Sequence, residues 1–203
     1  MTARLVVLAS GGGTNCQAVL DACQSGALDA QVVAVITNRR DAGVVDRAEQ
    51  AGVPWNYVEH HGQSRAERDA GDQRLITAVA AFEPTLVVLA GWMRILGAAV
   101  GAAFPIMNLH PAKPGEFAGT DAISRAFDAW QAGAIAESGV MVHWVPDEGV
   151  DTGPVIATAT VPFIDDDDID AFEARMHDAE HQLIVQGVRL ALSQLATPSS
   201  LRE

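Results

Sequence analysis

Short, almost wholly apolar runs alternate along the chain with longer segments of helical periodicity, and this alternation limits the fold more than any other feature. Residues 4–9, 31–37 and 85–90 consist largely of Val, Leu, Ile and Ala. Such runs are typical of strands buried on both faces of a parallel sheet, because side chains of both orientations must then be apolar. We therefore expect an α/β fold in which helices connect parallel strands.

The full pattern predicts a single-domain, mostly parallel twisted sheet of about seven strands with helices on both faces. The last strand is expected to be antiparallel to its predecessor, because the connection between them is short. The domain is expected to span residues 1–196, followed by a frayed tail at 197–203. The predicted strands are 4–9, 31–37, 53–58, 85–90, 106–110, 139–145 and 154–164, and the predicted helices are 16–24, 43–51, 65–82, 121–131 and 169–192.

Charge and composition narrow the possible partners and location. The formal net charge is -13, which repels nucleic acid and anionic membranes, so we expect neither as a partner. Cys16 and Cys23 are too few for a disulfide framework and are interpreted as free thiols in a reduced interior. The apolar run Leu5–Ala9 is too short for a signal peptide core or a membrane span. We expect a cytoplasmic protein, either a monomer or a homodimer.

A glycine-rich turn follows the first strand and leads directly into a helix. The sequence Ser10-Gly-Gly-Gly-Thr-Asn15 places free backbone N–H groups at a helix start, which favours an anion. No Gly-Lys-Ser/Thr follows, so the turn is not a Walker A loop. The third glycine of the dinucleotide fingerprint is replaced by Cys16, and no acidic residue ends the second strand. We predict a phosphate-binding turn, with a purely structural turn as the alternative.

Two polar side chains end the predicted strand 106–110. Asn108 and His110 are two residues apart, so a strand directs them to the same face, and Pro111 cannot continue the hydrogen-bond ladder. Ligands of open α/β sheets bind beyond the carboxyl ends of the strands. We therefore take Asn108 and His110 as the centre of the candidate site. A buried polar pair of purely structural importance is the alternative.

Several other segments carry a functional and a structural interpretation. Arg65, in the first turn of a helix opened by a capping box at Ser64, favours a ligand on dipole grounds, or is a solvated surface residue. Residues 93–96 (Met-Arg-Ile-Leu) suit a flat organic ligand, or form core with a snorkelling Arg. His60 and His61 are interpreted as a polar loop, not a metal site. The sequence 177–181 fits the inverted zinc-peptidase pattern H-x-x-E-H, which we consider improbable because no third ligand follows in a suitable place.

The combination and order of these motifs resemble the phosphoribosylglycinamide formyltransferase family of the folate-dependent purine pathway. The resemblance covers nearly the whole chain, from the first strand to the last helix. No single motif is specific, but the set is. The motifs are Ser10-Gly-Gly-Gly-Thr-Asn15, Leu89-Ala-Gly-Trp-Met-Arg-Ile-Leu96, Asn108-Leu-His-Pro111, Gly119-Thr-Asp-Ala-Ile123 and Asp147-Glu-Gly-Val-Asp-Thr-Gly-Pro154.

The resemblance implies transfer of the formyl group of 10-formyltetrahydrofolate, a co-substrate, to the amine of glycinamide ribonucleotide, with no metal. It assigns catalysis to Asn108, His110 and Asp151. The nucleotide phosphate would bind at Gly13, Thr14 and Asn15, and Glu180 would hold the amino end of the same substrate. The folate would bind at Arg65, Met93, Arg94, Ile95, Leu96 and Asp147.

The residue types suit this chemistry. Attack of an amine on a formyl carbon creates a tetrahedral oxyanion, which amide and imidazole donors stabilise. Asp151 would orient His110, raise the pKa of its imidazole and relay a proton. Related folate enzymes share this core: a formyltetrahydrofolate hydrolase or another formyltransferase is the alternative. The transfer RNA formyltransferases carry an RNA-binding domain for which we expect no room here, and the acidic charge is unfavourable for RNA.

Two segments depart from the usual pattern of the family. The loop 112–119 (Ala-Lys-Pro-Gly-Glu-Phe-Ala-Gly) has lost apolar residues and a proline, so we expect it to be more mobile and more polar. A Tyr-Pro pair that usually follows Glu180 is replaced by Ile184 and Val185. We therefore expect an unbroken final helix, and the resemblance does not fix the direction of the Glu180 side chain.

Overall fold

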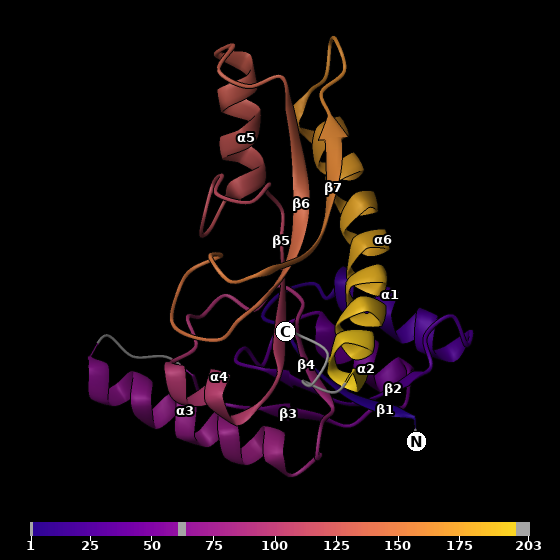
Figure 1. The fold of residues 1–203 in the computed structure, drawn as a ribbon, viewed down its shortest axis with the longest axis vertical. Coiled ribbons are helices and arrows are strands. Elements are labelled where there is room, and N and C mark those ends of the chain that lie inside the picture. The colour runs from indigo at the N-terminus through magenta and orange to yellow at the C-terminus, as the bar shows by residue number, and fades with distance from the viewer. Residues whose placement is uncertain (1, 61–63, 198–203) are drawn as a thin grey trace.

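The computed structural model describes residues 2–60 and 64–197, which form one seven-stranded sheet with helices on both faces (Figure 1). The strand order is β3-β2-β1-β4-β5-β6-β7. The strands are β1 (Ala3–Leu8), β2 (Ala30–Thr37), β3 (Trp55–Tyr57), β4 (Leu86–Leu89), β5 (Ile106–His110), β6 (Glu137–Trp144) and β7 (Val155–Pro162). The helices are α1 (Thr14–Gln24), α2 (Val44–Gln50), α3 (Arg65–Ala80), α4 (Ala98–Ala103), α5 (Ala122–Gln131) and α6 (Ile169–Ala196).

The apolar runs form the centre of the sheet because both of its faces are covered. In β1, Leu5 and Val7 face one hydrophobic core, while Val6 and Leu8 face the other. The first core also contains side chains of α1, α2, α5 and α6, and the second contains side chains of α3 and α4. This arrangement explains why no polar alternation is visible in β1 and β4, as expected for buried parallel strands.

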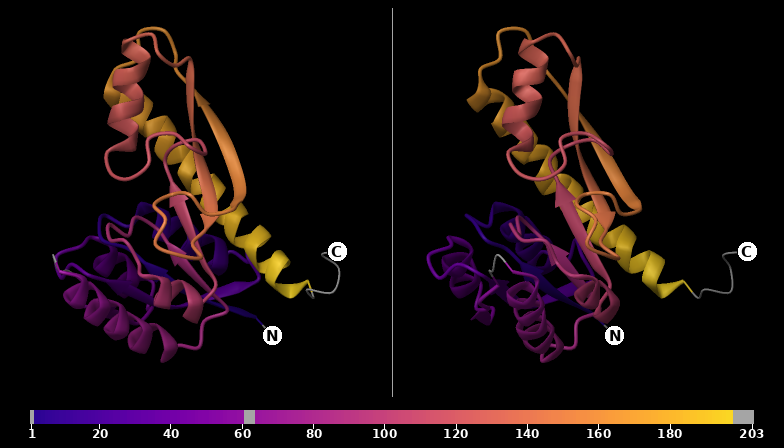
Figure 2. Two further views of the ribbon diagram at one scale, coloured as in Figure 1. Left: turned by 60° about the vertical axis from the view of Figure 1, so that its left-hand side comes forward. Right: turned by 90° about the vertical axis from the view of Figure 1, so that its left-hand side faces the viewer.

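The part of the sheet formed by the last strands of the chain is built differently. Strands β1 to β5 pair in parallel, whereas β6 is antiparallel to both β5 and β7. The last strand is thus antiparallel to its predecessor, as predicted. Figure 2 shows β6 and β7 rising together with α5 and the first half of α6 away from the remaining layers. The register places the end of β6 opposite the start of β5, and the loop between β6 and β7 returns along β5 to reach Asn108 and His110.

The helix boundaries follow the expected caps. Ser64 and Glu67 form the predicted capping box, and the Asp168 carboxylate accepts a hydrogen bond from the Ala171 N–H at the start of α6. Helix α6 is unbroken, as expected, but it extends four residues beyond the predicted end at 192. Residues 198–203 of the predicted tail lie outside the described part of the chain.

One helix was not predicted. Helix α4 has six residues, Ala-Ala-Val-Gly-Ala-Ala, and only Val100 is buried. A segment this short and this uniform shows no helical period of apolar and polar side chains, so periodicity cannot detect it. Among the described helices, none has the length and apolar character needed to cross a membrane.

Candidate active site

A cavity of about 760 Å³ opens at the carboxyl ends of β1, β4 and β5. The chain order reverses between β1 and β4, because β2 and β3 lie on one side of this pair and β5 lies on the other. Such a reversal separates the loops that follow the two strands and leaves a crevice for ligands. The glycine-rich turn after β1, the segment after β4 and the end of β5 all line this cavity.

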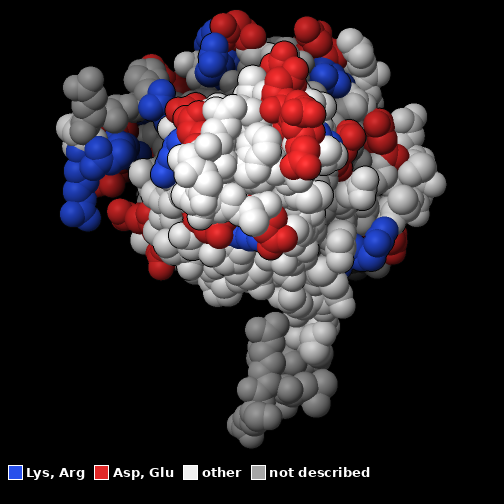
Figure 3. All heavy atoms as spheres, turned by 90° about the horizontal axis from the view of Figure 1, so that it is seen from above, with Lys and Arg blue, Asp and Glu red and all other residues white. Residues whose placement is uncertain are grey.

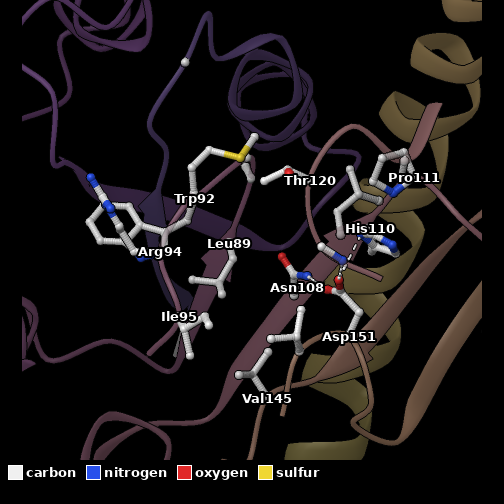
Figure 4. Close-up of a pocket in the computed structure, with 18 of the residues that line it drawn as sticks. Leu89, Trp92, Arg94, Ile95, Asn108, His110, Pro111, Thr120, Val145 and Asp151 are labelled. Carbon is white, nitrogen blue, oxygen red and sulfur yellow. Dashed lines mark hydrogen bonds and ion pairs between the residues drawn. The ribbon is translucent and has the colours of Figure 1, made fainter. Parts of the chain in front are cut away.

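Three polar side chains from distant parts of the chain meet in the cavity (Figure 4). The Asn108 amide Nδ2 donates to Asp151 Oδ1 over 3.1 Å. His110 Nδ1 lies 3.3 Å from Asp151 Oδ2. Strand β5 supplies Asn108 and His110 on one face, and the loop between β6 and β7 brings Asp151 to them. An amide, an imidazole and a carboxylate therefore share one hydrogen-bonded cluster.

Asp151 is held from several directions. The Gly119 N–H donates to its Oδ2 over 2.8 Å, and its backbone has a positive φ of 54°. Burial raises the pKa of the Asp151 carboxyl, but the adjacent His143 side chain, the hydrogen bond from the Gly119 N–H and the neighbouring His110 imidazole outweigh burial and hold this pKa below its ordinary value. Asp151 is therefore a carboxylate at neutral pH.

His110 contacts an acceptor through each ring nitrogen. Nδ1 faces Asp151, and Nε2 lies 3.2 Å from the Phe117 carbonyl oxygen. Burial nevertheless lowers the pKa of His110 below its ordinary value, since it outweighs the opposing effects of Asp151 and the Phe117 carbonyl. The net rise expected from the Asp151 charge alone is wrong, because the imidazole is almost wholly buried.

His143, on β6, completes the cluster. The antiparallel register places it directly opposite Asn108. Its Nδ1 lies 2.9 Å from the Trp144 carbonyl oxygen, which can only accept, so Nδ1 carries the proton and Nε2 is free to accept. The Asn108 Nδ2 lies 3.1 Å from His143 Nε2. The Asn108 amide nitrogen therefore lies within hydrogen-bonding distance of both His143 and Asp151.

The glycine-rich turn is shaped by α2, which packs against it. Gly13 has a φ of 74°, and a Cβ on it would lie 2.7 Å from Val44 Cβ. The Val44 N–H donates to the Gly11 carbonyl, and Arg47 Nε donates to the Gly12 carbonyl over 2.7 Å. These contacts occupy carbonyl oxygens of the turn and leave the start of α1 facing the cavity. Such a helix start favours an anion.

Glu180, on α6, enters the cavity beside this turn. Burial raises the pKa of Glu180 to about 7, although a hydrogen bond from Asn15 opposes the rise. The Asn15 Oδ1 is buried and has no hydrogen-bond partner among the described residues. Glu180 thus brings a carboxyl group to the cavity next to the anion-binding turn. A hydroxyl or amine group of a ligand would satisfy it.

The segment after β4 forms an apolar wall on the other side of the cavity. The side chains of Met93 and Ile95 are 63% and 58% exposed, whereas Trp92 and Leu96 are buried. Figure 4 shows Trp92, Arg94 and Ile95 across the cavity from Asn108 and Asp151. Ser10 fixes the start of the segment, because its Oγ accepts from the Met93 N–H over 3.0 Å. Exposed apolar side chains in a cleft favour an organic ligand.

Comparison with known proteins decides the family. The sequence model described as "Formyl transferase" matches residues 3–188. A phosphoribosylglycinamide formyltransferase of Schizosaccharomyces pombe is 42% identical over 201 residues, covering 93% of this chain and 96% of the relative. The chain belongs to the phosphoribosylglycinamide formyltransferase family. It is a formyltransferase of purine biosynthesis, and the fold and the family predicted from its motifs are confirmed.

Other members of the family support this assignment. The phosphoribosylglycinamide formyltransferase of Escherichia coli is 36% identical, covering 88% of this chain and 82% of the relative. A crystal structure of glycinamide ribonucleotide transformylase 1 from Symbiobacterium toebii superposes with a TM-score of 0.84 at 34% identity, covering 95% of this chain and 89% of that one. A crystal structure of the Streptococcus pneumoniae enzyme gives 0.77 at 39% identity, covering 92% and 97%.

The structure brings together nearly all the residues predicted for this formyltransferase site. The cavity is lined by the three central residues, the anion-binding turn, Glu180 and the apolar segment, namely Asn108, His110, Asp151, Gly13, Thr14, Asn15, Glu180, Met93, Arg94, Ile95, Leu96 and Asp147. Arg65 does not line it. Its side chain is 87% exposed and lies 3.8 Å from Asp69. Arg68, three residues further along α3, lines the cavity instead.

Sequence reasoning missed three histidines of the cavity, and His177 on α6 is one of them. His143 is one residue of an apolar strand, and only the β5–β6 register reveals that it faces Asn108. His60 was interpreted as part of a polar loop, yet it is buried and lines the cavity, while His61 lies outside the described residues. Within residues 2–60 and 64–197, no group of three His, Cys, Asp or Glu side chains is placed to hold a metal ion.

The loop 112–119 is anchored at several points. Ala112 is fully buried, and the Lys113 ammonium pairs with the Glu137 carboxylate on β6. The same loop supplies the Phe117 carbonyl to His110 and the Gly119 N–H to Asp151. The unusual sequence therefore still builds part of the cluster, and its greater mobility stays a prediction.

Proposed function

We propose that this enzyme transfers the formyl group of 10-formyltetrahydrofolate to the amine of glycinamide ribonucleotide. One observation carries the proposal: Asn108, His110 and Asp151 converge between an anion-binding turn and an apolar wall of the same cavity. A phosphorylated amine and a flat organic donor would enter from these two sides. Their reacting atoms would then meet at the cluster.

The nucleotide is proposed to bind on the side of α1 and α6. Its phosphate would accept hydrogen bonds from the N–H groups of Gly13, Thr14 and Asn15 at the start of α1. Glu180 would accept hydrogen bonds from donor groups of the same substrate, including the amino end. This arrangement would point the amine toward Asp151.

The folate is proposed to bind along the apolar wall. Met93 and Ile95 would contact its ring system, because they are exposed apolar side chains in a cavity. Asp147, Arg94 and Leu96 would line the same side. We propose Arg68 in place of Arg65 as the α3 arginine closest to this substrate, since only Arg68 lines the cavity.

The reaction would begin when the amine nitrogen attacks the formyl carbon. The carbonyl π pair moves to oxygen, and the resulting oxyanion is stabilised by the Asn108 amide and the His110 imidazole. Both groups have partners in the free enzyme, so the developing charge must draw Asn108 Nδ2 from Asp151 or His143, and His110 Nε2 from the Phe117 carbonyl. Such donors are pre-positioned within a small rotation of the reacting atom.

Asp151 would accept a proton from the substrate amine and then return it. The nitrogen that attacks becomes positively charged and gives a proton to the Asp151 carboxylate, directly or through water. The oxyanion then re-forms the carbonyl as the C–N bond to the folate breaks, and the departing nitrogen takes up the proton held by Asp151. The low pKa of Asp151 suits an acceptor that is ionised before each turnover.

An absorbance assay with 10-formyltetrahydrofolate, with and without glycinamide ribonucleotide, tests the proposal. We expect His110→Gln and Asp151→Asn each to lower turnover at least ~10²-fold, the effect of losing one oxyanion donor or general base. Asp166→Asn is the matched control, because Asp166 also has a positive φ, of 67°, in an exposed acidic loop. Near-normal turnover by either variant would remove that residue from the mechanism, and formate release without the nucleotide would favour the hydrolase instead.

A further inference from the structure

A buried imidazole–carboxylate pair lies behind the apolar wall of the cavity. His60 follows β3, and Asp72 lies in α3, and their exposed fractions are 3% and 4%. His60 Nε2 and Asp72 Oδ1 are 2.7 Å apart. A carboxylate oxygen only accepts, so His60 Nε2 carries the proton between them. Removing a carboxylate from water is costly unless it is fully hydrogen-bonded, so the pair calls for an explanation.

The second oxygen of Asp72 holds the end of the wall. Asp72 Oδ2 accepts from the Gly97 N–H over 3.1 Å. A Cβ on Gly97 would lie 2.2 Å from this oxygen, so a side chain at this position is incompatible with the contact. At the other end, Ser10 accepts from the Met93 N–H. Hydrogen bonds therefore hold the start of the segment 91–97 to the end of β1 and its end to α3.

The imidazole of the pair supports the middle of the wall. The ring of His60 packs edge-on against Trp92, with centroids 5.6 Å apart and an interplanar angle of 68°. Trp92 is buried, while its neighbour Met93 is largely exposed to the cavity. The buried Trp92 ring thus sets which side of the segment faces the ligand. Helix α3 approaches His60 closely at Gly71, where a Cβ would lie 3.3 Å from the imidazole.

We propose that His60 and Asp72 are positioning residues for the folate-binding wall. They fix the backbone at Gly97 and the ring of Trp92, so that Met93 and Ile95 present their apolar side chains before the ligand arrives. A fixed wall avoids the entropy cost of ordering the segment on binding. Loss of the pair should therefore weaken binding of the folate and leave binding of the nucleotide unchanged. This inference rests on the proposed function for its choice of ligand.

Steady-state kinetics with both substrates varied separately tests the inference. We expect His60→Leu to raise KM for 10-formyltetrahydrofolate at least about fivefold, the effect of a lost hydrogen bond, with less than about a twofold change in KM for glycinamide ribonucleotide. Asp72→Asn should largely preserve binding, because an amide can accept from Gly97 and donate to the other imidazole tautomer. Asp167→Asn, which weakens a pair with Arg175 at the start of α6, is the control that alters a partly exposed ion pair elsewhere.

Amide hydrogen exchange gives a readout that does not need activity. We expect His60→Leu to accelerate exchange at residues 92–97 more than elsewhere, whereas Asp167→Asn should not. Gly97→Ala is the second variant in case His60→Leu does not fold, because its Cβ displaces the segment without emptying the buried site. Unchanged exchange at 92–97, or an equal rise in both KM values, would overturn the inference. If the wild-type enzyme does not use the folate at all, the proposed function fails, while the exchange result still decides whether the pair holds the wall.

Discussion

At the scale of single residues, Glu180 combines a cost in stability with a role in binding. Its pKa of about 7 lies above the ordinary value of 4.5, because burial disfavours the charged form. A carboxyl whose pKa is raised by folding contributes stability at low pH and loses it as the pH rises through the folded pKa. At pH 8 the buried charge therefore opposes folding, and a substrate that donates hydrogen bonds to it relieves this cost.

We expect Glu180→Gln to stabilise the enzyme above pH 7 and to weaken nucleotide binding. The gain in the free energy of unfolding should grow between about pH 4.5 and pH 8, to at most about 3 kcal/mol. Thermal unfolding at several pH values measures it, together with KM for glycinamide ribonucleotide. Asp178→Asn, at an exposed position of the same helix, is the control. A stability difference that does not change with pH would contradict the titration of Glu180 in this range.

His143 is expected to act through Asn108. His143→Phe removes the acceptor at Nε2, so the Asn108 amide can rotate, and we expect kcat to fall about tenfold, as for a misplaced oxyanion donor. KM for both substrates should change little, because His143 lies at the cluster and not at either binding wall. The double variant His143→Phe/Asn108→Ala tests this coupling. If its kcat is as low as that of Asn108→Ala and no lower, the two residues act together. An unchanged kcat in His143→Phe would exclude this positioning role.

At the scale of elements, the contact between α2 and the glycine-rich turn joins packing to binding. Gly13→Ala has two costs: a positive φ of 74° and a Cβ that would meet Val44. Gly26→Ala has the first cost alone, since Gly26 has a φ of 77° and a Cβ on it would have no neighbouring atom within 4 Å. The two glycines therefore separate backbone strain from collision.

We expect Gly26→Ala to lose about 1 kcal/mol of stability and Gly13→Ala distinctly more. Gly13→Ala should also raise KM for glycinamide ribonucleotide, because the displaced turn no longer presents its N–H groups correctly. Denaturant unfolding and steady-state kinetics measure the two effects, and equal stability losses in the two glycine variants would exclude the collision with Val44.

At the scale of the whole molecule, excess negative charge opposes the compact state. The net charge is -13, and Figure 3 shows several groups of acidic side chains on the face seen from above. Self-repulsion of this kind is screened when the Debye length becomes shorter than the spacing of the charges. The substrates proposed here are anions too, so the local positive groups of the cavity must act against the overall field.

We expect the melting temperature to rise when NaCl is increased from about 0.02 M to about 0.5 M, where screening is short-ranged. Replacing Asp165 and Asp166 by Asn removes two exposed charges and should reduce the salt effect. Thermal unfolding followed by circular dichroism measures both. A melting temperature that is independent of salt would show that surface repulsion is not significant for stability.

The sequence alone determined the order of the main elements and the local pairings within them. The apolar runs predicted the central strands, because a strand buried on both faces has no polar alternation. The two-residue spacing of Asn108 and His110 placed both in the cavity, since strand periodicity is a local property. The capping box at Ser64 predicted a helix start for the same reason.

The tertiary structure decided everything that depends on which distant segments meet. The register of β5 and β6 brought His143 to Asn108, and the packing of α3 behind the wall joined His60 to Asp72 and placed Arg68, not Arg65, at the cavity. Burial also reversed the expected shift in the pKa of His110, although its neighbour Asp151 had been predicted. Periodicity fixes the direction of a side chain relative to its own element, but contacts, burial and solvation depend on how the elements pack together.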